Sequence, residues 1–597
     1  MLLLCYLWLW LLVTKALILL LLQLPVLLKL LLLPLLLQLV LLLQLPLQLK
    51  LLLQLTPLLL LPTLPLLQLI LLQLVLLLLP AQLLLLPLLL QNNIFTVKKA
   101  GYGLYPAFLF FRRPLPFFAS HIRYIIFRTH TQTILLPVML PVMPNLYDRF
   151  LEFLSPAEIL EATPALLNDQ RRRFVSEPDI ILQPHSIENV QEIMRFCFKH
   201  RIPVTPQGGN TGLCGAAVAS GGVLLNLSKI NRIREINLAD NSITVEAGVI
   251  LQNVQKAAAE AGRLFPLSLA SEGSCEIGGN IACNAGGLNV LRYGSMRDLV
   301  LGLEVILPNG ELVSHLQPLH KNTTGYDLRH LFIGSEGTLG IITAATLKLF
   351  ARPQTIATAW VGLDDIESAV QLLTAVQGHF AERLTSFELI SRYALVLSSE
   401  FSHLKQPTDA NWHVLLELTD SVPDAALDEK LAEFLYQNGQ ENSIIAQSEQ
   451  ERLDLWTLRE NISASQRKLG TSIKHDIAVP IAQVAAFVRQ CAPALETRFP
   501  GIQIVCFGHL GDGSLHYNTF LSDVLSNEAY RYEDAVNSIV YEHILACHGT
   551  IAAEHGIGTI KKHWLPSVRT PSEIALMRAI KAQLDPHNIM NPGKLLP

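Results

Sequence analysis

The chain has 597 residues, enough for two or three domains, and a formal net charge of −4. That small value hides an uneven distribution. All 49 acidic residues lie from Asp148 onward, whereas nine of the 45 basic residues precede it, which leaves 36 bases and a net charge of −13 for the rest. An acidic body argues against general nucleic-acid binding. The eight cysteines are scattered without a Cys-x-x-Cys pair, which favours a reducing compartment over a disulfide framework.

The first 90 residues are mostly leucine, interrupted by Gln, Pro and a few Lys. Residues 1–23 are long enough to cross a bilayer, although Lys15 lies inside them, and no basic start or cleavage site marks a secretory signal. Three interpretations stay open: a translated tandem DNA repeat upstream of the true start, a membrane anchor, or an organelle-targeting extension. We treat 1–142 as a low-complexity extension, with Met139 or Met143 as a suitable true start. The protein is then expected to be cytoplasmic, or membrane-associated if the extension is an anchor.

From residue 143 the composition becomes that of a folded protein. An N-terminal helical segment is expected over 143–177, a first domain over 178–352 and a second over 353–597. Ser186 should cap a helix that ends at His200. The alternation of helices and short strands favours an α+β fold over a plain parallel sheet. Strands are predicted over 177–184, 202–205, 223–227, 242–246, 355–363, 411–418 and 502–507, and further helices over 251–261, 364–377 and 424–437.

A glycine-rich stretch at Pro206–Ala216, Pro-Gln-Gly-Gly-Asn-Thr-Gly-Leu-Cys-Gly-Ala, lies between two predicted strands. Four glycines, with Asn210 and Thr211 among them, disfavour both helix and strand. Backbone amides freed from regular structure can converge on an anion such as a dinucleotide pyrophosphate, whereas the plainer interpretation is a surface turn. Neither a Rossmann nor a Walker pattern is present, so those two kinds of nucleotide site are excluded.

Two further glycine-rich regions follow, at 271–287 and 333–342. In the first of them, small and apolar residues alternate with turn-forming residues, so that the backbone could run close along a flat ligand. Three such backbones in one domain fit a single extended cofactor better than three unrelated turns.

These three regions resemble the FAD-binding domain of the vanillyl-alcohol-oxidase/PCMH type, and from about residue 178 onward the chain resembles the FAD-linked D-2-hydroxyacid dehydrogenases. The resemblance implies FAD between two α+β subdomains, with the first glycine loop around the pyrophosphate and the flavin bound with or without a covalent link. A FAD-linked oxidase C-terminal domain would follow, as a β/α substrate (cap) domain with the substrate and metal sites, and a C-terminal helical segment would end the chain. The residues that the resemblance places against FAD are Pro206, Gly208, Gly209, Asn210, Thr211, Gly212, Ser271, Gly278, Gly279, Asn280 and Ile342.

The second domain carries a run of chemically active residues at 508–518, Gly-His-Leu-Gly-Asp-Gly-Ser-Leu-His-Tyr-Asn. The Gly-Asp-Gly within it is typical of a hairpin turn, which would bring His509 and His516 together on paired strands. Further on, Glu554 and His555 stand side by side. Two imidazoles and one carboxylate suit zinc or a related divalent metal with a position left open for substrate, whereas the plainer interpretation is a pair of ordinary histidines.

A third cluster consists of Arg459 and Ser463, four residues apart and so expected on one helix face, and Lys474. Taken alone, these would be capping or salt-bridged surface residues. In the resembled family the matching Arg, a Thr and the Lys hold the far carboxylate of a dicarboxylic 2-hydroxyacid, and here Ser463 keeps the hydroxyl of that Thr without its methyl group. An Arg grips a carboxylate through two parallel hydrogen bonds and a Lys adds a point charge, so two cations favour a dicarboxylate over lactate.

The resemblance also implies a role for each remaining group. His509, His516 and Glu554 would bind Zn²⁺ or another divalent ion, which lowers the pKa of the substrate hydroxyl. Asn518 would hydrogen-bond the C1 carboxylate, and His555 would act as general base on the 2-hydroxyl. The alternative assignment makes His555 a metal ligand and Glu554 the base.

The expected function is the FAD-dependent oxidation of a D-2-hydroxyacid, D-2-hydroxyglutarate in the first place, to the 2-oxoacid. Oxidation of D-lactate or glycolate is a neighbouring alternative, and an inactive, membrane-tethered flavin-binding module is an alternative of another class. The family likeness implies a quinone or an electron-transfer flavoprotein as electron acceptor. A homodimer is considered as the assembly, and no nucleic-acid partner is expected.

Overall fold

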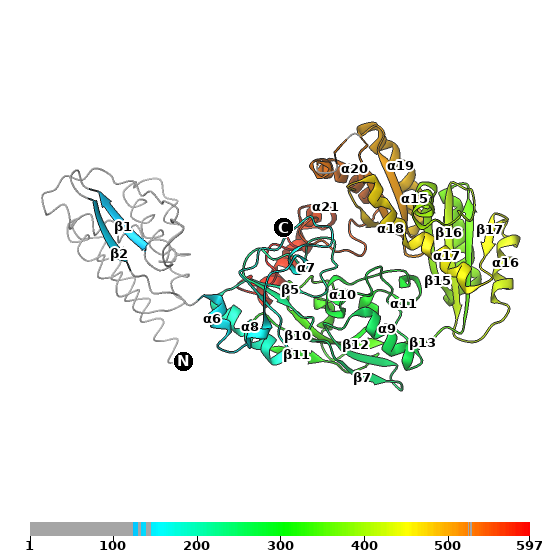
Figure 1. Cartoon of the computed structure of the whole chain (residues 1–597). Helices are drawn as coiled ribbons and strands as arrows, with labels where there is room; N and C mark the ends of the chain where they lie inside the picture. Colours follow the sequence, from blue (N-terminus) through cyan, green and yellow to red (C-terminus); the bar gives the residue numbers. More distant parts are fainter. Residues whose placement is uncertain (1–122, 129–132, 139–144, 523, 526–527) are drawn as a thin grey trace, which may run out of the picture. The chain divides into compact units, whose positions relative to one another are not determined.

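The computed structural model describes residues 123–128, 133–138, 145–522, 524–525 and 528–597 (Figure 1). The first two ranges are strands, β1 (Arg123–Arg128) and β2 (Thr133–Val138), which pair antiparallel. The leucine-rich residues 1–90 lie outside the described ranges, so the three interpretations of them stay predictions. Among the helices that are described, none is both long and apolar enough to cross a membrane.

A small sheet begins the main part of the chain, with strand order β3 (Ile159–Leu160), β4 (Ile180–Leu182), β6 (Val223–Asn226) and β5 (Val204–Gln207). Both β4 and β5 run parallel to β6. Helix α8 (Ile187–His200) packs on this sheet together with α6 (Leu146–Phe150), and α7 (Pro164–Leu167) lies between β3 and β4 in the chain. Ser186 caps α8 as predicted, because its side chain accepts a hydrogen bond from the Asn189 backbone N–H.

An antiparallel sheet follows, with strand order β11 (Leu312–His315), β10 (Val300–Ile306), β12 (Ile341–Lys348), β8 (Ser242–Glu246) and β7 (Ile233–Asn237). Helices α9 (Leu251–Glu260) and α10 (Ile277–Cys283) share an apolar core with its strands. The shorter elements here are β9 (Arg263–Leu264), α11 (Val290–Tyr293), α12 (Met296–Leu299), α13 (Arg329–Phe332) and β13 (Phe350–Ala351).

The second domain is built on a larger antiparallel sheet (Figure 1). Its strand order is β17 (Ser443–Ile445), β14 (Thr355–Leu363), β16 (Trp412–Asp420), β15 (Leu384–Ser391), β19 (Gln503–His509), β20 (Ser514–Phe520) and β18 (Asp476–Ala478). One apolar core joins it to α14 (Ile366–Phe380), α16 (Leu427–Gln437), α19 (Val484–Arg498) and α20 (Glu533–Ala546), and another to α15 (Arg392–Ser402), α17 (Glu449–Glu460) and α18 (Ile462–Ser465). Helices α21 (Leu565–Val568) and α22 (Pro571–Leu584) come last.

The prediction of an α+β fold is confirmed, since among the described strands parallel pairs occur only in the sheet of β3, β4, β6 and β5, and helices intervene throughout. Strands β8 and β14 have the predicted bounds. Strands β10 and β12 are not among the predicted strands. Both are buried along almost their whole length, so their sequences lack the apolar–polar alternation of a half-buried strand.

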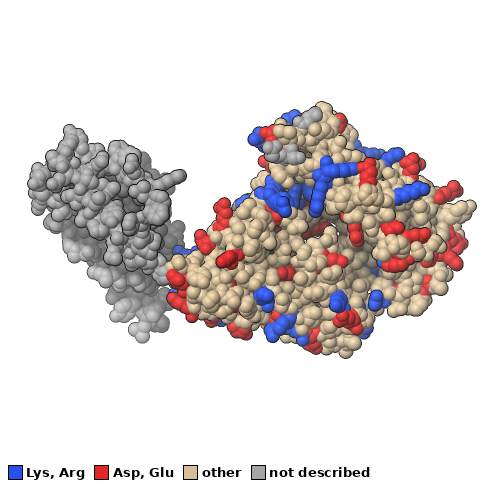
Figure 2. All heavy atoms as spheres, viewed as in Figure 1, with Lys and Arg blue, Asp and Glu red and all other residues tan. Residues whose placement is uncertain are grey.

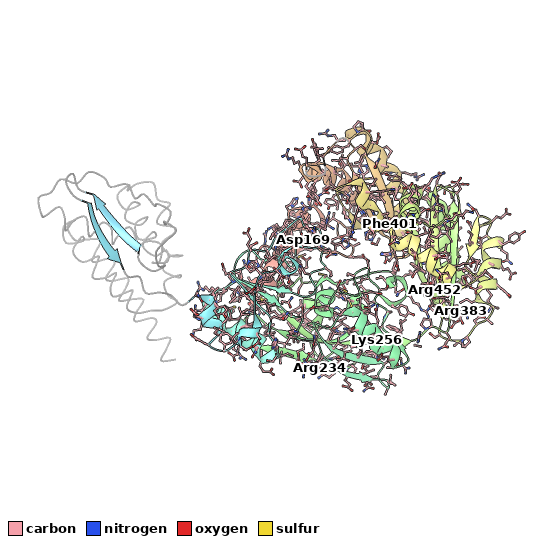
Figure 3. All side chains as sticks on the ribbon, viewed as in Figure 1. Asp169, Arg234, Lys256, Arg383, Phe401 and Arg452 are labelled. Carbon is pink, nitrogen blue, oxygen red and sulfur yellow. The ribbon has the colours of Figure 1, made fainter. Side chains whose placement is uncertain are left out.

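Helix α17 is fixed to the large sheet by polar contacts as well as by apolar packing. Glu417 on β16 accepts a hydrogen bond from the indole N–H of Trp456 at 2.8 Å. The same carboxylate pairs at 3.3 Å with Arg452, which is labelled in Figure 3. These contacts hold α17, which also carries Arg459, against the face of the sheet that includes Glu388.

The strand that carries Glu388 depends on the core behind it, where the neighbouring Phe387 is 1% exposed. Replacing Phe387 with Ala should lower the free energy of unfolding by about 3–5 kcal/mol, because a buried ring is replaced by a cavity. The control Val422→Ala, at a side chain that is 67% exposed, should change it by less than about 0.5 kcal/mol. Thermal unfolding of the full-length protein measures both, and equal midpoints for the two variants would contradict this packing.

Candidate active site

Four charged or imidazole side chains form a row across the large sheet. Glu388 on β15 lies opposite His509 on β19, and His516 on β20 lies opposite Asp476 on β18. Because side chains alternate along a strand, and β19 pairs with β20 through Phe507 and His516, the row lies on one face. That face is the one toward α15, α17 and α18.

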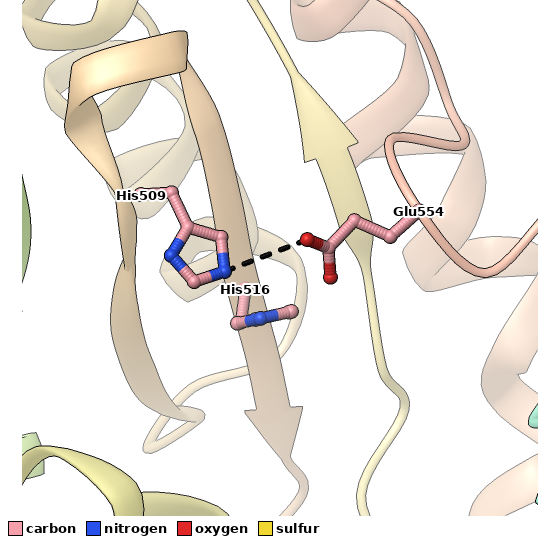
Figure 4. A group of neighbouring side chains, drawn as sticks. All are labelled: His509, His516 and Glu554. Carbon is pink, nitrogen blue, oxygen red and sulfur yellow. Dashed lines mark ion pairs between the residues drawn. The ribbon is translucent and has the colours of Figure 1, made fainter. Parts of the chain in front are cut away.

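The predicted metal ligands come together. The imidazole rings of His509 and His516 lie 5.8 Å apart between centroids, as expected across the predicted hairpin. Glu554 reaches them from a separate loop, with its Oε1 at 3.5 Å from the Nε2 of His509 (Figure 4). One ligand atom of each residue lies within 4.8 Å of the others, a spacing that could hold a metal ion.

Glu388 lies directly behind this cluster of His509, His516 and Glu554. Its carboxylate contacts the Nδ1 of His509 at 2.8 Å, which leaves Nε2 directed toward Glu554. Burial alone would lower the pKa of His509, but the charge and the hydrogen bond of Glu388 raise it to about 9. A carboxylate behind an imidazole fixes its orientation and is the usual second partner of a metal-bound histidine.

His555 lies beside His516, with the two rings nearly parallel at 17° and their centroids 5.9 Å apart. Asp476 positions it: the buried carboxylate accepts the backbone N–H of Glu554 at 3.1 Å and of His555 at 2.8 Å, and contacts the Nδ1 of His555 at 3.3 Å. Asp476, Glu554 and His555 also satisfy the spacing of a metal site, so the alternative assignment of His555 stays open.

Arg459 and Ser463 do not share an environment. Arg459 is 5% exposed, and both its Nε and one terminal nitrogen contact Oε2 of Glu388, at 2.8 and 2.7 Å. The guanidinium also lies 4.9 Å from the ring centroid of Phe507. Ser463 follows the end of α17 at Glu460, on the short helix α18, and is exposed. The expectation of one continuous helix face is therefore wrong, because the chain interrupts the helix between them.

Lys474 lies at a small cavity that it shares with Arg171, Asp476, His555 and Lys561. Burial lowers the pKa of Lys474 to about 8, and the positive charge of Arg171 adds to this effect. Figure 2 shows lysine and arginine side chains beside a hollow on the viewed face. Asn518 is buried on β20, where its amide donates to the side-chain oxygen of Gln466 at 3.0 Å.

The three glycine-rich regions converge, as predicted. A Cβ on Gly209 would lie 2.0 Å from the carbonyl oxygen of Ser274, so the first region packs on the second with no room for a side chain. A Cβ on Gly337 would lie 2.5 Å from Pro206, which joins the third region to the first. The Glu336 N–H donates to the carbonyl of Ala282 at 2.8 Å, which joins the third region to the second.

The residues expected to touch FAD differ in how tightly they already pack against, or hydrogen-bond to, other parts of the protein. A Cβ on Gly212 or Gly279 would meet nothing within 4 Å, whereas one on Gly278 would lie 2.7 Å from the Cβ of Ala247. The Asn210 side chain donates to the carbonyls of Ala165 and Asn168. Thr211 is half-buried, and Asn280 is 6% exposed. The carbonyl of Ser271 accepts the backbone N–H groups of Ser274 and Cys275. Ile342 packs in the apolar core of its sheet.

A buried carboxylate ties the two domains together at the site. Glu336 accepts the backbone N–H groups of Ile557 and Gly558, each at 2.7 Å. In the same loop, Oε1 of Glu554 accepts the N–H of Gly287 at 2.7 Å. The loop that carries Glu554 and His555 is thus held by the glycine-rich regions of the first domain.

Sequence reasoning missed Glu388, Asp476, Glu336 and Arg171. Asp476 offered a signal, since it follows Lys474 by two residues and alternation would place both on one face of a strand. Glu388 lies 121 residues before His509, and only the pairing of β15 with β19 brings them together.

Two family models match the chain, "FAD binding domain" over residues 178–315 and "FAD linked oxidases, C-terminal domain" over 352–595. Among solved structures, p-cresol methylhydroxylase with substrate bound has a TM-score of 0.61 at 17% identity, covering 76% of this chain and 98% of that one. An alkyldihydroxyacetonephosphate synthase has a TM-score of 0.58 at 17% identity, covering 75% and 84%. These likenesses define a flavoprotein with the predicted PCMH/vanillyl-alcohol-oxidase type of FAD-binding fold.

Curated relatives narrow the class. The D-2-hydroxyglutarate dehydrogenase of Stutzerimonas stutzeri (strain A1501) is 37% identical over 462 residues, which cover 76% of this chain and 99% of that protein. The mitochondrial D-2-hydroxyglutarate dehydrogenase of Rattus norvegicus is 36% identical over 427 residues, which cover 70% and 78%. The chain belongs to the FAD-linked D-2-hydroxyacid dehydrogenase family and is a FAD-dependent enzyme that acts on CH–OH donors, as predicted.

The contacts of Glu388 generate a prediction about stability. Glu388→Gln removes the charge that pairs with Arg459 and His509 and leaves a buried guanidinium without its counter-ion, so the free energy of unfolding should fall by about 3–5 kcal/mol. The control Glu400→Gln breaks a surface pair with Lys468 and should cost about 0–1 kcal/mol. Urea denaturation followed by tryptophan fluorescence measures both, and a loss no larger than that of the control would rule out a structural role for the Glu388 charge.

Proposed function

We propose that this enzyme oxidises D-2-hydroxyglutarate to 2-oxoglutarate. The observation that carries the proposal is the placement of Lys474 in one cavity with His555 and Arg171, close to the cluster of His509, His516 and Glu554. A proton acceptor and a candidate metal site suit a substrate hydroxyl that lies beside one carboxylate. Two cations suit a second carboxylate at the far end of the same substrate. The names of the relatives support the same substrate.

FAD would be held by the three converging glycine-rich regions. The fit is supported by Gly209, where a Cβ would collide with the Ser274 backbone of the second region, and by Gly212 and Gly279, where a Cβ would meet nothing within 4 Å and the backbone stays open to a ligand. When bound, FAD supplies the two-electron acceptor for the hydrogen on C2 of the substrate.

His509, His516 and Glu554 would hold Zn²⁺ or a related divalent ion. The donor set fits such an ion in residue type and spacing: Glu388 orients His509, and burial lowers the pKa of His516 well below its ordinary value, which keeps that imidazole neutral. His509, whose pKa Glu388 raises to about 9, would release its proton when the ion binds. When bound, the ion supplies a Lewis acid for the substrate hydroxyl.

His555 would remove the hydroxyl proton. Its Nδ1 faces Asp476 at 3.3 Å, which leaves Nε2 as the nitrogen that takes the proton. The buried Asp476 carboxylate would stabilise the imidazolium that results. The overall change removes one hydrogen with two electrons from C2 and one proton from the hydroxyl, which converts the alcohol to a carbonyl.

The far carboxylate of the substrate would bind Lys474, with Arg171 as a second cation at the same cavity. Arg459 donates a hydrogen bond to Glu388 through Nε and forms an ion pair with it, whereas its buried Nη2 has no hydrogen-bond partner among the described residues, so Arg459 would contribute its charge and that free donor. Asn518 would turn its amide from Gln466 to the C1 carboxylate. Ser463 would contribute its hydroxyl to the far carboxylate.

D-Lactate oxidation is a second candidate, because Arg459 is already paired with Glu388 and Ser463 is exposed, which weakens the predicted grip on a far carboxylate. A dehydrogenase also requires an electron acceptor. A quinone or an electron-transfer flavoprotein stays the prediction for it, and a homodimer stays the prediction for the assembly.

Anaerobic mixing with a panel of 2-hydroxyacids tests the proposal. D-2-Hydroxyglutarate should bleach the flavin absorbance at least tenfold faster than D-lactate or glycolate at equal subsaturating concentration, a difference of about 1.4 kcal/mol in transition-state binding. Lys474→Met should abolish that preference with little change for D-lactate, because only the longer substrate reaches the ammonium group. Faster bleaching by D-lactate would favour the second candidate, and no bleaching by any of the acids would leave only a flavin-binding module.

His555→Ala separates the two roles proposed for this residue. If His555 is the base, turnover should fall by about 10²–10⁴-fold while the metal content of the purified protein stays unchanged. His548→Ala is a matched control, because His548 follows α20 and is exposed. Loss of the metal in His555→Ala would make His555 a ligand and reject its assignment as the base.

A further inference from the structure

Glu276 places a buried carboxyl group with one unsatisfied oxygen behind the first glycine loop. The residue is 6% exposed. Its Oε1 accepts a hydrogen bond from the Ser228 hydroxyl at 2.7 Å. Its Oε2 is shielded from water and has no hydrogen-bond partner among the described residues. A buried polar atom without a hydrogen-bond partner is unfavourable, so a partner from outside the chain is expected for it.

The unsatisfied Oε2 of Glu276 lies close to Gly208 of the first glycine loop. A Cβ on Gly208 would lie 3.1 Å from the Oε2 of Glu276 and 3.3 Å from its Cβ. The next residue, Gly209, is packed more tightly still, because a Cβ there would lie 2.0 Å from the carbonyl oxygen of Ser274. The carboxyl group therefore lies against the backbone of the loop on which the FAD pyrophosphate is expected.

The surroundings of Glu276 favour its neutral form. Burial raises the pKa of its carboxyl group to about 7, and the hydrogen bond from Ser228 offsets only part of this effect. No neighbouring charge in the described part of the chain offsets the effect of burial on the Glu276 carboxyl group. Lys229, next to Ser228, is exposed, and Glu246 on β8 is paired with Arg232. The adjacent Cys275 thiol has a raised pKa through burial and so stays neutral as well.

We propose that Glu276 is a further residue of the FAD site, and that its protonated carboxyl group admits the pyrophosphate at Gly208 whereas its carboxylate repels it. A protonated carboxyl has an O–H donor, and phosphate oxygens in a diphosphate act as acceptors. Ionisation removes that donor and places a negative charge behind the loop that binds an anion. The proposal rests on the assignment of FAD to the three glycine-rich regions but not on the identity of the substrate.

The sign of the pH dependence follows from linkage. FAD binds the protonated form, so its affinity should be constant below the pKa of the free protein and should fall as the pH rises through it. With one proton involved, the dissociation constant of FAD should increase about tenfold for each pH unit above 7 until the pKa of the complex is reached. Flavin loading would then be a function of pH in the absence of any substrate.

The test measures FAD binding itself. Full-length protein freed of flavin is titrated with FAD from pH 6 to pH 9, and the dissociation constant is obtained from quenching of flavin fluorescence. Wild-type protein should lose at least tenfold in affinity between pH 7 and pH 9. Glu276→Gln keeps a donor and cannot ionise, so its dissociation constant should change less than about twofold over the same range. The control Glu260→Gln, on the exposed side of α9, should keep the wild-type profile.

The outcomes are distinguishable from those of the proposed function, because no substrate is present. A wild-type dissociation constant that is flat from pH 6 to pH 9, or a pH profile of Glu276→Gln that matches the wild type, would overturn the role of Glu276. Circular dichroism of each variant checks its fold, and the wild-type profile tests the proposal even where a variant does not fold. Failure of wild-type protein to bind FAD at every pH would overturn the proposal together with the FAD assignment.

Discussion

The site depends on two buried carboxylates that pair with cationic or imidazole groups on the same face of one sheet. Glu388 pairs with Arg459 and His509, and Asp476 holds His555 and the backbone beside it. A buried carboxylate without such partners would be strongly unfavourable, so each one requires the groups that surround it to stay in place. The pairing fixes the orientation of the imidazoles before any ligand arrives, which is the preorganisation that catalysis needs.

The same electrostatic principle connects the two domains. The Glu336 carboxylate from the third glycine-rich region accepts two N–H groups of the loop that follows His555, and Glu554 from that loop accepts the N–H of Gly287. The backbones proposed to hold FAD therefore also determine where Glu554 and His555 lie. A substitution in the glycine-rich regions should therefore shift the position of His555, although no side chain of the substrate site is altered.

The chemistry of the site could be predicted from local patterns, because its principal groups occur in short motifs. The Gly-Asp-Gly turn correctly predicted that His509 and His516 lie together. The three glycine-rich regions meet, as expected. The supporting groups could not be predicted in this way. Glu388 reaches His509 only through strand pairing over 121 residues, and the break after α17 that separates Arg459 from Ser463 has no strong signal in the sequence. Motifs reveal reactive groups, whereas long-range pairing decides their orientation.

The central claim is that His509, His516 and Glu554 form one metal site beside the flavin. Anomalous diffraction from crystals of the FAD-loaded protein, recorded on both sides of the zinc absorption edge, tests it most directly. We expect one peak bounded by the two imidazoles and the Glu554 carboxylate, or the equivalent peak at the absorption edge of another divalent metal. Crystals without a peak there, grown from protein that still reduces its flavin with D-2-hydroxyglutarate in the presence of a chelator, would contradict it.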